Sequence, residues 1–169
     1  MNKKLIAGLL AVTLCFTMLG CKGASDDGAG QGVSVKEEDV PPTLSFNGNT
    51  VSLNDNPDDV LATLGDADKT EQLEACVDYF YGGVRIEVFN NNGDKTIAGI
   101  YATDDSATTA DGISVGSSYD DLIAAYGEPS FDGESSEGQE FTYVYSAFTI
   151  TFTVSQDVVT QIGITAGMG

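Results

Sequence analysis

The chain has 169 residues and a formal net charge of −19, from 26 acidic and 7 basic residues, and it contains no histidine. This length allows one domain of ordinary size or two small ones. The strong acidity argues against nucleic-acid binding, which depends on cations that neutralise phosphates. The missing histidine excludes Ser-His and Cys-His nucleophilic systems and histidine metal sites. No phosphate-binding glycine loop or nucleotide fingerprint is present, so we expect no cofactor.

The N-terminus has the pattern of a targeting segment. Lys3 and Lys4 precede an apolar run, Leu5–Leu19, which is short for a membrane span but fits a secretory signal. The run ends in Gly20-Cys21, which resembles the lipobox of bacterial lipoproteins. The resemblance implies a lipoprotein signal peptide over residues 1–20, cleavage before Cys21, and a lipid on Cys21 that anchors the chain to the membrane on its extracytoplasmic side. The alternative is a plain signal peptide in which this cysteine is incidental.

Residues 21–42 are predicted to form a disordered acidic tether. The segment is rich in Gly, Ser, Asp and Glu, closes with Pro41-Pro42, and has too little apolar surface to form a core. No later segment is long and apolar enough to span a bilayer.

The folded part is predicted to open with a hairpin and a short helix. Asn47-Gly48 between residues 44–46 and 50–53 is a hairpin signal. Asn56 is a candidate N-cap for a helix that starts at Pro57 and stops at Gly65.

This stretch recurs later in the chain. Residues 51–67 superpose without a gap on residues 113–129, and the second copy predicts a helix between Ser118 and Gly127. The identical pairs are Ser52/Ser114, Asp58/Asp120, Asp59/Asp121, Ala62/Ala124 and Gly65/Gly127. The paired aspartates sit at helix starts, where capping explains them without catalysis.

Three predicted strands follow each helix. They are residues 77–81, 84–89 and 95–103 in the first copy, and 141–145, 148–154 and 158–165 in the second. The loop over residues 131–139 is longer than its counterpart. We therefore predict an α+β fold of two tandem units, each a helix plus a three-stranded antiparallel sheet. The units cover residues 43–104 and 105–169 and together form one compact domain.

The two-residue links predict which face of each sheet is buried. Tyr81 pairs with Val84 and Tyr79 with Ile86, so the tyrosines are interpreted as core residues beneath the helix rather than as a ligand-binding row. The opposite face is aromatic and charged in the first unit and rich in threonine in the second. Asp78 falls opposite Glu87, which is unfavourable unless a cation or Arg85 lies between them.

This open face of the first unit is the candidate binding surface. Its predicted partner-binding residues are Phe80, Arg85, Glu87, Phe89, Ile97 and Tyr101. Exposed aromatics around an arginine have the composition of binding hot spots. The alternative is that the other sheet or a second subunit covers them; the oligomeric state is not readable from the sequence.

Three other chemistries have candidate residues in the sequence. Cys76 is the lone cysteine of the mature domain, interpreted as a small buried hydrophobe rather than a reactive or dimerising thiol. Calcium binding by residues 54–59 or 90–94 lacks the twelve-residue loop pattern, so no metal site is predicted. A paired-carboxylate hydrolase is a third possibility by residue type alone.

The motif of residues 113–129 followed by three strands resembles the tandem α+β lipoproteins related to β-lactamase inhibitory protein. It is also similar to the small SmpA/OmlA lipoproteins of outer-membrane barrel assembly, and to a set of Gram-positive surface lipoproteins with the same two units. Only the second copy keeps the Gly-x-Pro ending, at Gly127 to Pro129. The resemblance implies a concave protein-binding sheet surface. We expect a non-enzymatic, lipid-anchored protein-binding module, with an envelope small-ligand or calcium sensor as the alternative.

Overall fold

The structure is a computed structural model, and it describes residues 33–36 and 40–167. The elements in chain order are β1 (Thr43–Phe46), β2 (Asn49–Ser52), α1 (Pro57–Leu64), β3 (Lys69–Gln72), β4 (Cys76–Tyr81), β5 (Val84–Asn91), β6 (Asp94–Ala102), β7 (Ala107–Thr109), α2 (Tyr119–Tyr126), β8 (Phe131–Glu134), β9 (Gln139–Val144), β10 (Phe148–Ser155) and β11 (Val158–Ala166).

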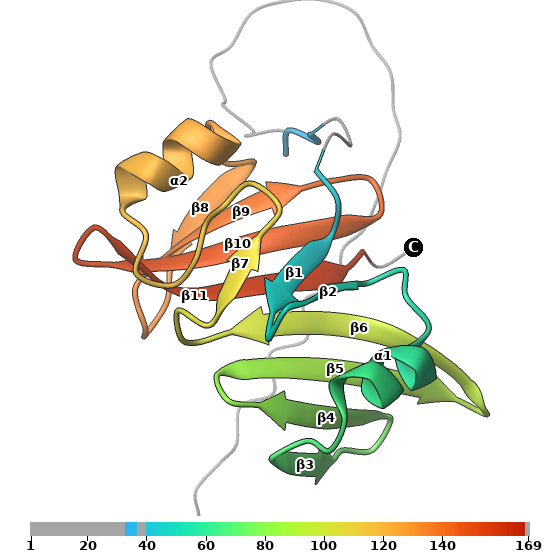
Figure 1. Cartoon of the computed structure of the whole chain (residues 1–169). Helices are drawn as coiled ribbons and strands as arrows, with labels where there is room; N and C mark the ends of the chain where they lie inside the picture. Colours follow the sequence, from blue (N-terminus) through green and yellow to red (C-terminus); the bar gives the residue numbers. More distant parts are fainter. Residues whose placement is uncertain (1–32, 37–39, 168–169) are drawn as a thin grey trace, which may run out of the picture. The chain divides into compact units, whose positions relative to one another are not determined.

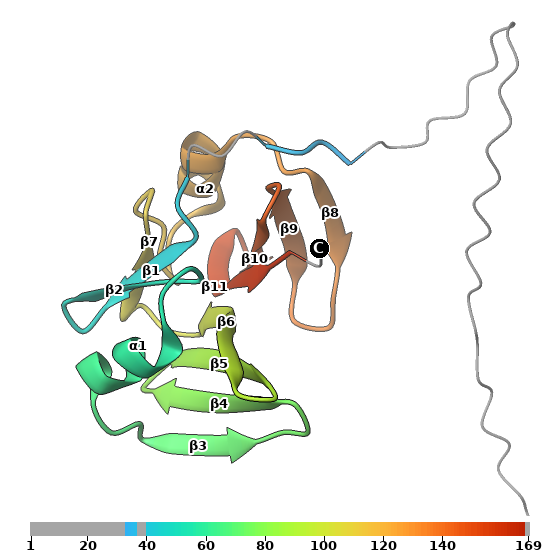
Figure 2. The same ribbon diagram turned by 90° about the vertical axis from the view of Figure 1, so that its right-hand side faces the viewer.

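One long antiparallel sheet dominates the fold (Figure 1). Its eight strands run in the order β3-β4-β5-β6-β11-β10-β9-β8, and a second sheet has the order β2-β1-β7. Both helices and the small sheet lie on the same side of the long sheet, which leaves its other face open (Figure 2). The core fills the space between these two layers.

Both helices begin and end at the predicted residues. The Asn56 side chain accepts hydrogen bonds from the backbone N–H groups of Asp58 (2.9 Å) and Asp59 (3.3 Å), and Pro57 occupies the first turn of α1. Ser118 caps α2 in the same way by accepting from the N–H of Asp121 at 3.1 Å. Gly65 and Gly127 end the helices at positive φ. The predicted helix boundaries are therefore confirmed.

Of the two tyrosines interpreted as core residues, Tyr81 is buried and Tyr79 is only partly buried, and their pairings with Val84 and Ile86 are as expected. Tyr143 and Tyr145 are buried in the second half of the sheet. The Tyr81 hydroxyl donates to the carbonyl of Gly65 at 3.2 Å, and the Tyr143 hydroxyl donates to the carbonyl of Gly127 at 3.0 Å. Each buried phenol thus holds the end of a helix on the sheet.

The predicted fold class, an α+β fold of two helix-plus-three-strand units, is wrong. The described chain is mostly β-structure, with two helices of eight residues each, and β6 pairs with β11 to make one continuous sheet across the predicted boundary at 104/105. The strands β3 and β8 add a fourth strand on each side of this seam. All four residues of each edge strand are exposed, so neither strand has the alternating hydrophobic pattern that would predict it.

The predicted signal peptide (1–20), the lipidation residue Cys21 and most of the predicted tether (21–42) lie outside the described residues. Within the tether, Val35 forms a parallel bridge with Val144 of β9, and the ammonium of Lys36 donates to the carbonyl of Tyr126 at 3.3 Å. A cation at this position complements the C-terminal end of α2. Among the described residues, the helices are all too short to traverse a lipid bilayer.

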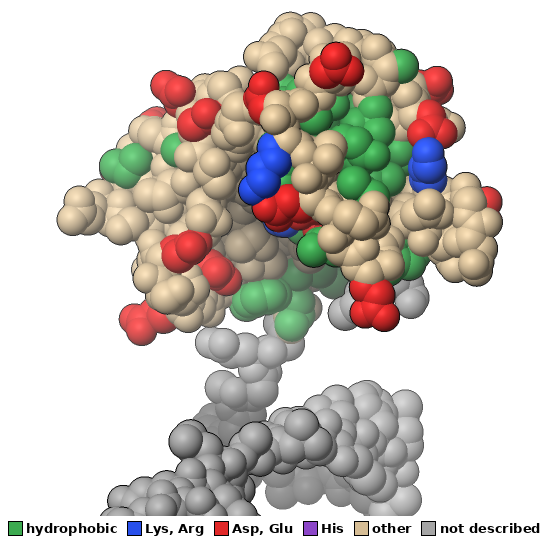
Figure 3. Space-filling model, turned by 90° about the horizontal axis from the view of Figure 1, so that it is seen from below, with side chains coloured by type: hydrophobic (Ala, Val, Ile, Leu, Met, Phe, Trp, Pro, Cys, Tyr) green, Lys and Arg blue, Asp and Glu red, His purple; other side chains and the backbone are tan. Residues whose placement is uncertain are grey.

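The two helices cover the sheet to different extents. Under α2, Phe141 and Tyr143 are buried, whereas the corresponding Val77 and Tyr79 of β4 are only half-buried near α1. In the view from the β3 side, hydrophobic side chains are visible at the surface with basic side chains on either side of them (Figure 3).

Candidate functional site

The open face carries a row of directly paired residues that crosses all eight strands. We call it the central row. From β3 to β8 it consists of Lys69, Phe80, Arg85, Tyr101, Gly163, Thr151, Thr142 and Phe131. Cations and aromatics alternate in its first half, and its second half contains a glycine, two threonines and a terminal phenylalanine. The row exists only because β6 and β11 are paired, which places Tyr101 opposite Gly163.

A second row of acidic residues runs beside the central row. We call Glu71, Asp78 and Glu87 the acidic row; Asp78 is paired with Glu71 on one side and with Glu87 on the other. Like charges directly opposite one another destabilise a sheet unless cations lie between them. The cations of the adjacent central row supply this compensation, because Lys69 forms an ion pair with Glu71 and Arg85 forms one with Asp78.

The Arg85–Asp78 ion pair lies at the centre of the site. The Nη1 of Arg85 donates to Oδ2 of Asp78 at 2.9 Å, which is one of the two arrangements that the sequence left open for the opposed acids Asp78 and Glu87. The Asp78 side chain is only 3% exposed, whereas that of Arg85 is 33% exposed. A buried carboxylate that loses its cation becomes strongly unfavourable, so Asp78 holds Arg85 in place. The second oxygen, Oδ1, is also buried and has no hydrogen-bond partner among the described residues.

Tyr101 lies flat on the sheet beneath Arg85. The Arg85 guanidinium is 4.0 Å from the centre of the Tyr101 ring, and the Tyr101 hydroxyl donates to Glu87 at 3.3 Å. Burial, followed by the charge of Glu87, raises the pKa of Tyr101 above its ordinary value. A methyl group on Gly99 would lie 2.6 Å from the Tyr101 hydroxyl, and one on Gly163 would lie 3.3 Å from the ring. These two glycines therefore make room for the ring.

The second half of the open face is partly covered by a loop. The Gln161 amide of β11 donates to the carboxylate of Glu137 at 2.5 Å, and Gly138 lies against the backbone of Val154. This is the longer loop noted in the sequence. Threonines in this half are paired with one another or buried: Thr142 bonds with Thr151 at 3.2 Å, and both Thr142 and Thr153 are buried.

A hollow of about 320 Å³ lies on the open face, on the side that the loop leaves uncovered. It is lined by Glu71, Asp78, Phe80, Gly82, Gly83, Arg85, Tyr101, Thr103 and Gln161. Residues of the central row and of the acidic row thus meet in one concave site, beside Gln161, which bonds to the loop.

Five of the six predicted partner-binding residues lie on this face. Phe80, Arg85 and Tyr101 line the hollow, Glu87 bonds with Tyr101, and Phe89 is 37% exposed further along β5.

The prediction that Ile97, the sixth residue, lies on the open face is wrong. A bulge after Glu87 shifts the register, so that Ile97 pairs with Val88 and is buried in the core at 1% exposure.

The sequence prediction of the site omitted several of its residues. The sequence predicts Asp78 on this face but not within the site, and Glu71 belongs to the unpredicted strand β3. Gly99 carries no chemical signal of its own. The signal that could have found Asp78 was its position directly opposite Glu87 with the single arginine nearby.

Cys76 is a free, half-buried thiol at the start of β4. Burial, together with the adjacent Glu87 carboxylate, raises the pKa of the Cys76 thiol. Its reactive thiolate form is therefore disfavoured.

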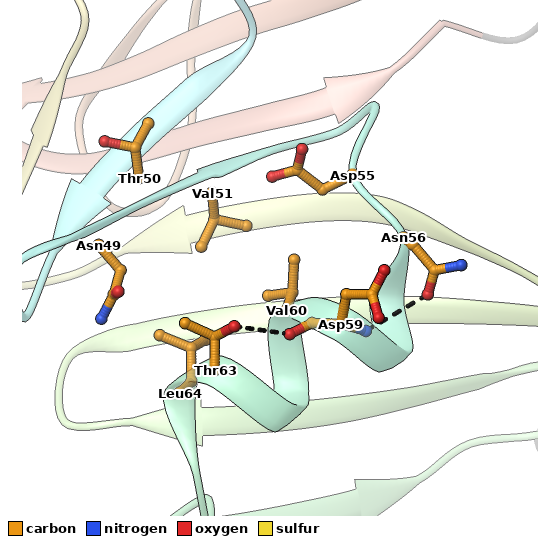
Figure 4. A pocket seen from close by; sticks show the side chains of 9 residues that line it. All are labelled: Asn49, Thr50, Val51, Asp55, Asn56, Asp59, Val60, Thr63 and Leu64. Atoms are coloured by element: carbon orange, nitrogen blue, oxygen red, sulfur yellow. Dashed lines mark hydrogen bonds between the residues drawn. The ribbon is translucent and has the colours of Figure 1, made fainter.

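A second hollow of about 260 Å³ lies between β2 and α1 (Figure 4). Its polar groups serve local structure: Asp55 accepts from the N–H of Ser52 at 2.8 Å, and the Thr63 hydroxyl donates to the carbonyl of Asp59 at 2.9 Å. The hollow includes Asp55, Asn56 and Asp59, which belong to residues 54–59, one of the two segments that carry oxygen ligands suited to calcium. Within the part of the chain that the structure describes, no three His, Cys, Asp or Glu side chains converge so as to hold a metal ion.

No family model and no curated protein matches the sequence. Among solved structures, the chain is similar to an extracellular protein containing an SCP domain from Bacillus anthracis, with a TM-score of 0.51 and 8% identity over 65% of this chain and 42% of that chain. A DUF4309 family protein from Bacillus subtilis has a TM-score of 0.47 and 15% identity over 69% of this chain and 82% of that chain. A cysteine-rich secretory protein from Staphylococcus aureus has a TM-score of 0.47 and 12% identity over 78% and 50%.

The first of these similarities indicates a shared fold, and the chain spans less than half of that protein's length. The resemblance to β-lactamase inhibitory protein and to barrel-assembly lipoproteins stays a prediction.

Replacing Gly99 with alanine should displace Tyr101 from its place beneath Arg85, because the added methyl group collides with the phenol. The displaced ring gains exposure, so the Tyr101 pKa should fall toward its ordinary value. NMR titration of the chain labelled with ¹³C at the tyrosine Cζ measures this pKa. Gly133→Ala is the matched control, because no atom lies within 4 Å of its added methyl group. An identical Tyr101 pKa in Gly99→Ala and Gly133→Ala would contradict the proposed packing.

Proposed function

We propose that this chain is a lipid-anchored extracytoplasmic protein without enzymatic activity, which binds a partner protein on the open face of its long sheet. The observation that carries the proposal is the ordered Arg85–Tyr101 pair in a concave site on that face. Side chains that are held in one conformation before binding lose little entropy when a partner arrives.

The composition of the site favours binding over catalysis. Arginine and aromatic residues are enriched at the centres of protein interfaces, and Phe80, Arg85, Phe89 and Tyr101 provide both types on one surface. The carboxylates nearest to the site are engaged: Asp78 with Arg85, Glu71 with Lys69 and Glu87 with Tyr101. This arrangement matches ion-pair compensation rather than a pair of free catalytic acids.

The N-terminal sequence supports the proposed location. Lys3, Lys4, the apolar run Leu5–Leu19 and Gly20-Cys21 together have the pattern of a lipoprotein signal. The similar structure from Bacillus anthracis is described as extracellular, which agrees with an extracytoplasmic location. A lipid on Cys21 would keep the binding face within reach of other envelope proteins.

Replacing Cys21 with serine should release the chain from the membrane, because the lipid has no other attachment point in this proposal. Detergent phase partitioning of the expressed chain measures the change: the unaltered chain should enter the detergent phase and Cys21→Ser the aqueous phase or the medium. Cys76→Ser is the matched control and should partition like the unaltered chain. Detergent-phase recovery of Cys21→Ser would reject the lipid anchor.

A photo-crosslinking amino acid placed at Phe89 in intact cells should give a discrete adduct with one partner. Val158 is the matched control position, since its exposure of 38% nearly equals the 37% of Phe89 and it lies at the turn between β10 and β11. Arg85→Gln should abolish the Phe89 adduct, while its amide can still donate to Asp78. The same adduct from both positions, or an adduct that Arg85→Gln leaves unchanged, would show that the open face is not the binding surface.

A further inference from the structure

The charges of the acidic row beside the hollow do not balance. The acidic row contributes three carboxylates, and the described cations beside them are Lys69 and Arg85. Glu87 has a neutral partner, the Tyr101 hydroxyl. One negative charge therefore remains without a cation among the described residues at this site.

One carboxylate oxygen of Asp78, the neighbour of Glu87 in the acidic row, also lacks a donor. Asp78 is 2% exposed and lines the hollow, and its buried Oδ1 has no hydrogen-bond partner in the described part of the chain. An unpaired buried acceptor is costly, and this cost is larger for a charged group. A ligand that brings both a positive charge and an N–H donor would remove both deficits.

The aromatic residues of the site already hold cations. The Lys69 ammonium lies 5.2 Å from the centre of the Phe80 ring, and the Arg85 guanidinium lies 4.0 Å from that of Tyr101. The Lys69 side chain is 61% exposed, so an incoming cation can replace it over Phe80 at little cost. Aromatic faces beside carboxylates are the usual surroundings of bound ammonium and guanidinium groups.

We propose that the hollow bounded by Glu71, Asp78, Phe80, Arg85 and Tyr101 binds a lysine or arginine side chain of a basic segment of the partner protein. This inference rests on the proposed function and names the chemistry of the partner. The cation enters beside Phe80 and donates toward Asp78, and Glu71 lies next to it at the edge strand. The net charge of −19 attracts a basic partner to the whole molecule, and the hollow selects where one of its cations is held.

Titration of the ¹⁵N-labelled full chain with an amidated tetralysine peptide tests this inference. The largest amide shifts should fall on Asp78, Phe80 and Arg85, and the same peptide with every lysine acetylated should not bind. Asp78→Asn should weaken binding about tenfold, because it removes the buried charge. Glu71→Gln should weaken it about threefold without affecting folding, because Glu71 is exposed.

Glu134→Gln is the matched control, since Glu134 is exposed on the opposite edge strand β8. Its affinity for tetralysine should equal that of the unaltered chain. Equal weakening by Glu134→Gln and Glu71→Gln, equal binding of the acetylated peptide, or the absence of binding would overturn the cation pocket. If the chain forms the Phe89 crosslink but does not bind tetralysine, the open face is still the binding surface. Only the proposal that the hollow holds a lysine or arginine side chain is then rejected.

Discussion

The pairing of β6 with β11 is the interaction on which the rest of this molecule depends. Four residue pairs, from Gly99–Thr165 to Ala102–Ile162, join the two halves of the sheet. On the covered face this pairing places Ile100 beside Ile164 within one core. On the open face it brings Gly163 beneath the Tyr101 ring, so that a residue of the second half supports the binding site of the first.

The site that results is held together by a buried charge. Asp78 is shielded from water, and a carboxylate in such surroundings needs a cation nearby. Arg85 satisfies this need from the adjacent strand and is thereby fixed over Tyr101, where a third of its side chain faces solvent. The same constraint that keeps the sheet stable therefore orients the groups that a partner would meet. In the second half, paired threonines and the loop that contains Glu137 occupy the corresponding surface.

Local signals predicted the parts of the fold that local interactions determine. The caps Asn56 and Ser118, the glycine stops and the Tyr81–Val84 pairing all follow from neighbouring residues. The edge strands β3 and β8 could not be predicted, because every residue in them is exposed and the hydrophobic pattern is absent. The bulge that buries Ile97 depends on a register shift with no sequence signal. The β6–β11 pairing joins segments that are far apart in the chain, and no local sequence pattern indicates such a pairing. The continuity of the open face was therefore not predictable from the sequence.

Native-state hydrogen exchange at the seam tests the central claim most directly. If β6 and β11 form the middle of one sheet, the hydrogen-bonded amides of residues 99–102 and 162–165 should exchange only through global unfolding, at the rate of the most protected core amides. Denaturant should then unfold both halves in one transition. Exchange at the seam as fast as in the exposed edge strand β3, with separate unfolding of the two halves, would contradict the continuous sheet and the site built across it.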